Sequence, residues 1–122
     1  MTDADIGQLV KLAEGYYEGM LHGKAELLER VFEPGARFQG VRDGEQIRRG
    51  LGEFIAMVGG SKADGEPAVE FSLSIEVLDM TGPVAVIKVK DRFRGRTYVD
   101  YLTVVKIGAV WRIVNKAFTT VD

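Results

Sequence analysis

The sequence contains no cysteine and a single histidine, and each absence excludes a class of site. Without cysteine there is no disulfide, thiolate nucleophile, iron–sulfur cluster or cysteine-bound zinc. A single histidine excludes a metal centre with several histidine ligands, and we expect no metal and no cofactor. Because His22 directly precedes Gly23 at the end of an expected helix, we assign it a capping role rather than a catalytic one.

An excess of positive charge and a long hydrophobic run are also missing. Sixteen Lys and Arg residues stand against eighteen Asp and Glu residues, which gives a net charge of −2. This balance argues against sequence-independent binding to nucleic acid, which depends on neutralising phosphates. The longest uncharged stretches are broken by Gly and Ser, so we expect no membrane span. The acidic N-terminus differs from a signal peptide, and we expect a cytoplasmic protein.

What the sequence does contain is the composition of one globular domain, residues 1–122, with 46% apolar and 28% charged residues. Apolar residues recur every three or four positions in the first half, which predicts helices over residues 6–20, 24–32 and 51–58. Short extended pieces are expected at 36–41 and 45–49. The period then changes to two, which predicts strands over 69–77, 84–93, 96–106 and 111–119. Helices followed by an antiparallel meander indicate an α+β fold.

Two short turns determine which strand residues share a face. If 94–95 and 108–109 are two-residue loops, Leu102 pairs with Asn115. The face expected to be covered by helices then carries Asp91, Asp100 and Asn115 toward one end. Buried carboxylates are costly unless they are paired or open into a cavity, so this end of the sheet is either a rim or a pocket.

The opposite face of the predicted sheet is too apolar for free contact with solvent. It mixes cations, Lys116 among them, with four apolar or aromatic side chains on adjacent strands: Tyr101, Val105, Val114 and Phe118. Such a patch is typical of a surface that binds a partner. We therefore expect a homodimer formed through this outer face, with a two-fold axis that brings the patch against itself.

Five segments carry a family resemblance: YEGM (17–20), KAELL (24–28), FEPGA (32–36), DYLTVVKI (100–107) and WRIVNKAF (111–118). Together they resemble the nuclear-transport-factor-2-like superfamily and, within it, the SnoaL-like, putative lumazine-binding branch. The resemblance implies a cystatin-like cone, in which three helices pack into the concave face of a curved antiparallel sheet around a pocket. Members include isomerases, dehydratases, cyclases and binding domains without catalysis, so the fold leaves the function open.

The resemblance also suggests a role for individual residues. Acid–base members place a carboxylate on an interior strand face, where the register puts Asp100, the candidate catalytic residue. A structural ion pair of Asp100 with Arg37 or Arg96 is the alternative. The steroid isomerases use a tyrosine on the first helix, but the aspartate they need on the first strand is missing here, so Tyr17 is expected in the pocket wall. Glu33 replaces a histidine that is common in this branch, which excludes histidine-dependent chemistry.

These observations predict an apolar pocket that binds a small molecule of unknown identity. Its expected ligand-binding residues are Tyr17, Leu21, Phe38, Phe54, Trp111, Ile113 and Asn115. The alternative is a SnoaL-like isomerase, dehydratase or cyclase that uses Asp100 as a proton shuttle, and a third possibility is a dimerisation module. Whether the chain is an enzyme stays open at this point.

Overall fold

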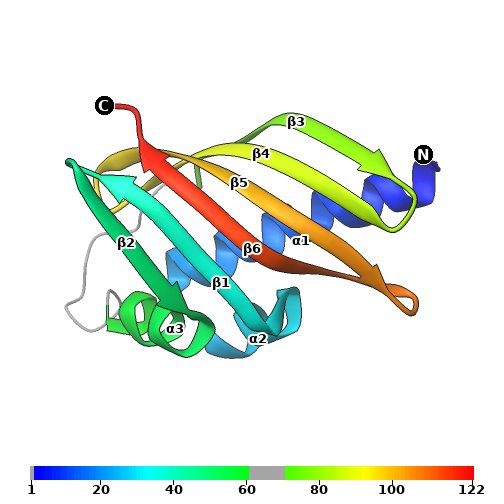
Figure 1. The fold of residues 1–122 in the computed structure, drawn as a ribbon, viewed down its shortest axis with the longest axis horizontal. Helices are drawn as coiled ribbons and strands as arrows, with labels where there is room; N and C mark the ends of the chain where they lie inside the picture. Colours follow the sequence, from blue (N-terminus) through cyan, green and yellow to red (C-terminus); the bar gives the residue numbers. More distant parts are fainter. Residues whose placement is uncertain (1, 61–70) are drawn as a thin grey trace.

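Three helices cover one face of a six-stranded sheet in the computed structural model, which describes residues 2–60 and 71–122 (Figure 1). The helices are α1 (Asp3–His22), α2 (Ala25–Val31) and α3 (Leu51–Gly60). The strands are β1 (Phe32–Arg42), β2 (Glu45–Gly50), β3 (Leu73–Thr81), β4 (Val84–Phe93), β5 (Arg96–Ile107) and β6 (Val110–Thr120). The predicted α+β architecture, with helices on the concave face of a curved sheet, is confirmed.

The strands follow the order β2-β1-β6-β5-β4-β3 across the sheet. All neighbours are antiparallel except β1 and β6, which run parallel. The sheet is therefore mixed, because the extended pieces expected at 36–41 and 45–49 join it as β1 and β2. The strand expected over 69–77 is present from Leu73 onward, and residues 69 and 70 lie outside the described residues.

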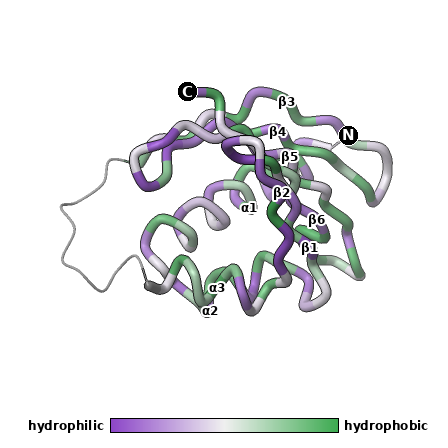
Figure 2. Tube along the Cα trace, turned by 60° about the vertical axis from the view of Figure 1, so that its left-hand side comes forward, coloured by the Kyte–Doolittle hydropathy of each residue, from purple (hydrophilic) through white to green (hydrophobic). Residues whose placement is uncertain are grey.

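Helix α1 begins and ends at its predicted capping residues. The Thr2 hydroxyl accepts a hydrogen bond of 3.1 Å from the backbone N–H of Asp5, which satisfies a donor of the first turn. Gly23 has a φ of 62°, a left-handed conformation that ends the helix and favours glycine. Seen from the side, α1 lies inside the curve of the sheet, with α2 and α3 beside it (Figure 2). Its Tyr16 and Tyr17 are consequently fully buried.

The predicted strand register is confirmed for β4 and β5 but only in part for β5 and β6. The turn at 94–95 gives the expected pairing, so Asp91 and Asp100 both lie on the inner face. Between β5 and β6 the expected pairing holds up to Val104 and Ile113. Beyond this point a β-bulge shifts the register by one residue, and the predicted pairing is wrong.

The bulge exchanges the two faces of β6 for the rest of the strand, because side chains alternate along it. Leu102 pairs with Lys116 instead of Asn115. Lys116 therefore faces inward and is buried, whereas Asn115 belongs to the outer face. Phe118 pairs with Asp100 and also faces inward, so its predicted place in the outer patch is wrong.

Candidate functional site

A pocket with an enclosed volume of about 50 Å³ lies between the inner face of the sheet, the end of α1 and α3. Most of its lining is apolar or aromatic, and Phe38 stacks on Phe54 with ring centroids 4.4 Å apart. These two rings and Phe118 form what we call the aromatic wall. The polar residues fall into two groups, a buried floor (Asp91, Asp100 and Lys116) and an arginine rim (Arg42, Arg49 and Arg94).

Asp100 occupies the floor and is fully buried. The Tyr16 hydroxyl, equally buried, donates a 2.7 Å hydrogen bond to Asp100 Oδ2. Burial, followed by the Asp100 carboxyl, holds the pKa of Tyr16 well above 10, so the hydroxyl remains a donor. The alternative ion pair is not formed within the described residues: Arg37 is exposed, and Arg96 binds Asp43.

Asp91 lies diagonally across from Asp100 on the neighbouring strand and is only 1% exposed. Burial, and next the Asp100 carboxyl, raise the pKa of Asp91 to about 9, although Lys116 opposes the shift. Asp91 is therefore protonated at neutral pH. The Asp91 oxygens and Asp100 Oδ1 find no hydrogen-bond donor among the described residues apart from the proton that the two carboxyl groups share. Buried carboxyl groups of this kind are rare in proteins unless a ligand or solvent meets them.

Lys116 completes the floor, and its side chain is only 5% exposed. Its nitrogen lies over three aromatic rings, at 4.8 Å from the centroid of Phe54 and 5.0 Å from those of Tyr16 and Phe118. It also contacts Met20 Sδ at 3.8 Å. Aromatic faces stabilise a buried cation electrostatically, which explains how a lysine is tolerated at this depth.

The arginine rim surrounds the more exposed side of the pocket. Arg42 donates to the Tyr98 hydroxyl at 3.0 Å, and Arg94 donates to the backbone oxygen of Met57 at 2.8 Å. Arg49 contacts the sulfur of the same Met57. None of the three forms an ion pair with a carboxylate in the described part of the chain. Each guanidinium carries five donors, so most of this hydrogen-bonding capacity is unused.

Comparison with known proteins identifies the family. A family model described as putative lumazine-binding matches residues 4–119. The chain belongs to this family. Comparison of the putative lumazine-binding chain with the curated proteins gives no match.

Solved structures share the fold of this chain over nearly its full length. An NTF2-like protein of unknown function from Silicibacter pomeroyi is 31% identical, with a TM-score of 0.90 and coverage of 99% of this chain and 100% of its own. One from Shewanella baltica is 19% identical, with a TM-score of 0.85 and coverage of 100% and 98%. A putative NTF2-like dehydratase from Streptomyces avermitilis is 18% identical, with a TM-score of 0.74 and coverage of 98% of both chains. The last two comparisons show the fold alone.

The structure brings three of the predicted site residues of this family member together in the pocket: Asp100, Phe38 and Phe54. Tyr17 lies elsewhere, because its hydroxyl donates to the backbone oxygen of Arg92 at 2.6 Å. The Trp111 indole donates to Asp5 Oδ1 at 3.1 Å, at the far end of α1. Three other residues that were predicted to bind the ligand do not line the pocket. They are the half-buried Leu21, the fully buried Ile113 and the outward-facing Asn115.

Two polar residues of the site were missed from the sequence. Lys116 was placed on the outer face, since nothing in the alternation of β6 marks the bulge. Tyr16 was passed over in favour of its neighbour Tyr17, because adjacent tyrosines on a helix give no sign of which one meets the sheet. The sequence contained one indication of Tyr16: a tyrosine on the first helix can donate to a carboxylate such as Asp100 on the inner face of the sheet.

Within residues 2–60 and 71–122, no three histidine or carboxylate side chains gather as metal ligands would. No helix in the described ranges combines the length and apolarity needed to cross a bilayer.

Proposed function

We propose that this domain, residues 1–122, binds a small molecule in the pocket between α3 and the sheet. The observation that carries the proposal is the pair of buried carboxyl groups on the floor, whose oxygens lack donors among the other described residues. A shared proton still leaves at least one of these buried oxygens without a donor among the described residues, at a cost of about 1–3 kcal/mol that a bound polar ligand or water removes. An apolar pocket with a few convergent polar groups is typical of small-molecule sites.

The size of the pocket limits the ligand. Its enclosed volume of about 50 Å³ lies far below the roughly 300–1,000 Å³ of sites for drug-sized molecules. The family description mentions lumazine, but a bicyclic ring of that size is larger than the enclosed space. The proposed ligand is therefore smaller, with only part of it enclosed.

A second candidate function is proton transfer of the isomerase or dehydratase type. The carboxyl pair favours it, because Asp91 holds a proton at neutral pH beside Asp100. Two neighbouring carboxyl groups that share a proton can act as acid and base. In this reaction Asp100 would accept a proton from the substrate, and Tyr16 would keep its carboxyl oriented through their hydrogen bond.

A thermal-shift screen with small planar aromatic compounds, run on the wild type and on Asp100→Asn, tests the proposed function. Asparagine still accepts the Tyr16 hydrogen bond, so we expect a nearly unchanged melting temperature and weaker binding of the compounds that stabilise the wild type. Loss of stability without a ligand response in either protein would mean that Asp100 serves packing alone.

We further propose a homodimer formed through the outer face of the sheet, in a cytoplasmic protein. With Phe118 turned inward, the exposed apolar residues that support it lie on β3, β4 and β5: Val77, Val84, Val86 and Tyr101. Tyr101 is 47% exposed, and Lys88 lies over its ring at 5.7 Å. A contiguous exposed apolar patch marks a protein–protein contact surface, and tyrosine is enriched in such surfaces.

A further inference from the structure

Small-molecule binding by itself does not explain why three arginines line the opening of the pocket. Arg42 comes from β1, Arg49 from β2 and Arg94 from the turn after β4, so three separate segments bring a guanidinium to one opening. Two of them meet at Met57 of α3, where Arg94 binds the backbone oxygen and Arg49 contacts the sulfur. These contacts engage neutral atoms, and none of the three guanidinium groups forms an ion pair within the described residues, although Asp43 interacts electrostatically with the adjacent Arg42.

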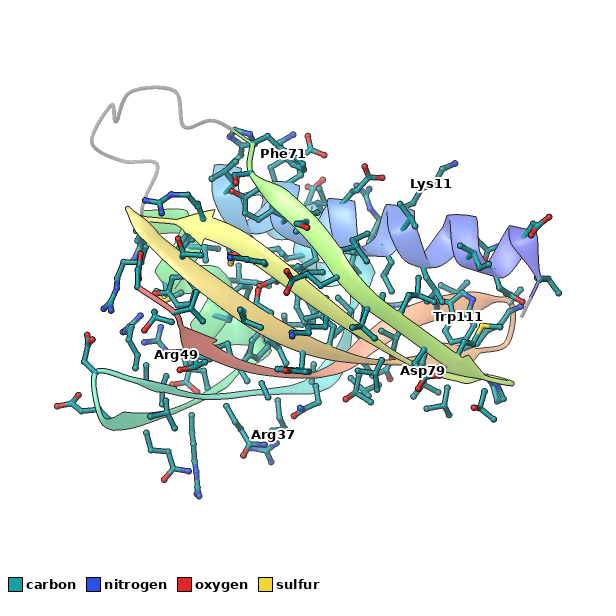
Figure 3. All side chains as sticks on the ribbon, turned by 90° about the horizontal axis from the view of Figure 1, so that it is seen from above. Lys11, Arg37, Arg49, Phe71, Asp79 and Trp111 are labelled. Atoms are coloured by element: carbon teal, nitrogen blue, oxygen red, sulfur yellow. The ribbon has the colours of Figure 1, made fainter. Side chains whose placement is uncertain are left out.

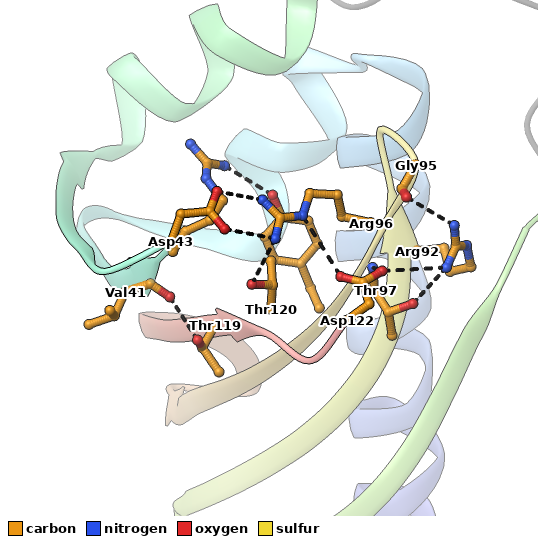
Figure 4. A network of polar contacts seen from close by, with 11 residues as sticks. Val41, Asp43, Arg92, Gly95, Arg96, Thr97, Thr119, Thr120 and Asp122 are labelled. Atoms are coloured by element: carbon orange, nitrogen blue, oxygen red, sulfur yellow. Dashed lines mark hydrogen bonds and ion pairs between the residues drawn. The ribbon is translucent and has the colours of Figure 1, made fainter.

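Other arginines at the same end of the molecule are neutralised. Arg96 forms two hydrogen bonds with Asp43, of 2.7 and 3.0 Å, and lies 3.8 Å from Asp122 (Figure 4). Arg92 lies 3.9 Å from the same Asp122 carboxylate. The rim arginines are close to this network but outside its ion pairs. The fold thus gives ion pairs to these neighbouring arginines and, among the described residues, gives none to the rim.

The charge of the pocket is correspondingly one-sided. Four basic side chains and two acidic ones line it, and one of the two acids, Asp91, is protonated at neutral pH. The chain as a whole carries a net charge of −2, so this positive character is local. Guanidinium groups bind carboxylates through paired, charge-assisted hydrogen bonds, which makes an organic anion the complementary ligand.

The aromatic wall defines the rest of the ligand. Phe38 and Phe54 are stacked with an interplanar angle of 19°, and Phe118 lines the same pocket. A flat body packs well against such rings, and the small enclosed volume restricts it to a single ring or a short unsaturated chain.

We propose that the pocket takes a small planar organic carboxylate, whose carboxylate group binds the arginine rim and whose body lies against the aromatic wall toward Asp91 and Asp100. The assignment rests on the proposed small-molecule-binding function and names its ligand class. It also orients the ligand, because the carboxylate stays at the rim and the opposite end reaches the floor.

Three probes of nearly the same shape and different charge test the proposal: benzoate, benzamide and benzamidine. Binding is followed by calorimetry at low salt and by the NMR signals of Phe54 and Phe118. We expect benzoate to bind at least about tenfold more tightly than benzamide, since a hydrogen bond to a charged group contributes about 1.5–3 kcal/mol. Benzamidine should bind more weakly than either, and added salt should weaken the binding of benzoate.

Variants locate the effect at the rim. Arg49→Gln and Arg94→Gln should each weaken benzoate binding and leave benzamide binding unchanged. Arg37→Gln and Arg48→Gln are matched controls, because both side chains are exposed and lie outside the pocket lining. Figure 3 shows Arg37 projecting away from the sheet on the side opposite α1. These controls should bind benzoate like the wild type.

Two results would overturn the carboxylate assignment. If benzamide or benzamidine binds at Phe54 and Phe118 as tightly as benzoate, the pocket binds small molecules without selecting anions, and the proposed function stands. If no probe changes these signals, or if the rim and control variants behave alike, the rim is not an anion site. The thermal-shift screen then decides the proposed function separately.

Discussion

The proton on Asp91 links the stability of the protein to pH. The folded protein keeps this proton up to about pH 9, whereas an unfolded chain loses it near 3.8. The folded state therefore binds more protons than the unfolded state between these values. The free energy of unfolding accordingly decreases as pH rises through this range, by up to about 1.4 kcal/mol per pH unit.

Replacing Asp91 by asparagine removes this pH dependence. Asparagine resembles the protonated carboxyl in shape and does not ionise, so we expect Asp91→Asn to gain stability relative to the wild type as pH rises from 5 to 8. Urea unfolding at several pH values measures the difference. Asp79→Asn, at an exposed position of β3, is the control and should follow the wild type. Parallel profiles for the wild type and Asp91→Asn would contradict the raised pKa.

The hydrogen bond from the Tyr16 hydroxyl to Asp100 should stabilise the folded protein. Tyr16→Phe removes the donor to Asp100 Oδ2 and leaves that buried oxygen without a partner among the described residues. We expect a loss of about 1–3 kcal/mol in the free energy of unfolding at pH 7. Tyr101→Phe removes an exposed hydroxyl and should leave stability nearly unchanged. Equal effects of the two substitutions would show that the buried hydrogen bond contributes nothing.

The close contact between helices α1 and α2 depends on Gly19, because glycine has no side chain. A Cβ atom at Gly19 would lie 2.8 Å from two side-chain carbons of Leu28, so alanine there forces the helices apart. We expect Gly19→Ala to cost about 1–3 kcal/mol. Gly7→Ala, on the same helix with nothing within 4 Å, should instead gain about 0.5–1 kcal/mol from its higher helix propensity. Thermal unfolding of both variants measures the contrast, and a gain for Gly19→Ala would refute the close packing.

The elements themselves could be predicted because their periods and turns are local properties. The apolar period of α1, its capping residues and the turn at 94–95 all act within a few residues, and the structure confirms them. The bulge in β6 and the parallel pairing of β1 with β6 arise from contacts between distant segments. For this reason Asp91 and Asp100 were placed correctly, whereas Lys116 and Phe118 were assigned to the wrong face.

At the scale of the whole molecule, the proposed dimer depends on the outer face of the sheet. Tyr101→Asp places a charge at the centre of the exposed apolar residues, where a partner would have to bury it. We expect light scattering at tens of micromolar to report twice the chain mass of 13.4 kDa for the wild type and the monomer mass for the variant. A wild-type monomer, or a dimer that Tyr101→Asp leaves intact, would contradict the proposal.

The family and the fold follow from the whole chain, but the ligand depends on a few positions. The match over residues 4–119 and the shared fold leave the function open, because the same cone accommodates different sites. In this chain the features that bear on the ligand are the carboxyl pair on the floor and the arginine rim. Both candidate functions depend on the carboxyl pair, in which burial and Asp100 keep Asp91 protonated.

An NMR titration of the aspartate side-chain carbons in the folded protein, from pH 4 to 10, tests that claim most directly. We expect one carboxyl signal of the wild type to titrate near pH 9 and to be absent from the spectrum of Asp91→Asn. The claim would be contradicted if every aspartate carboxyl, Asp91 included, completed its titration below about pH 5, as model peptides do.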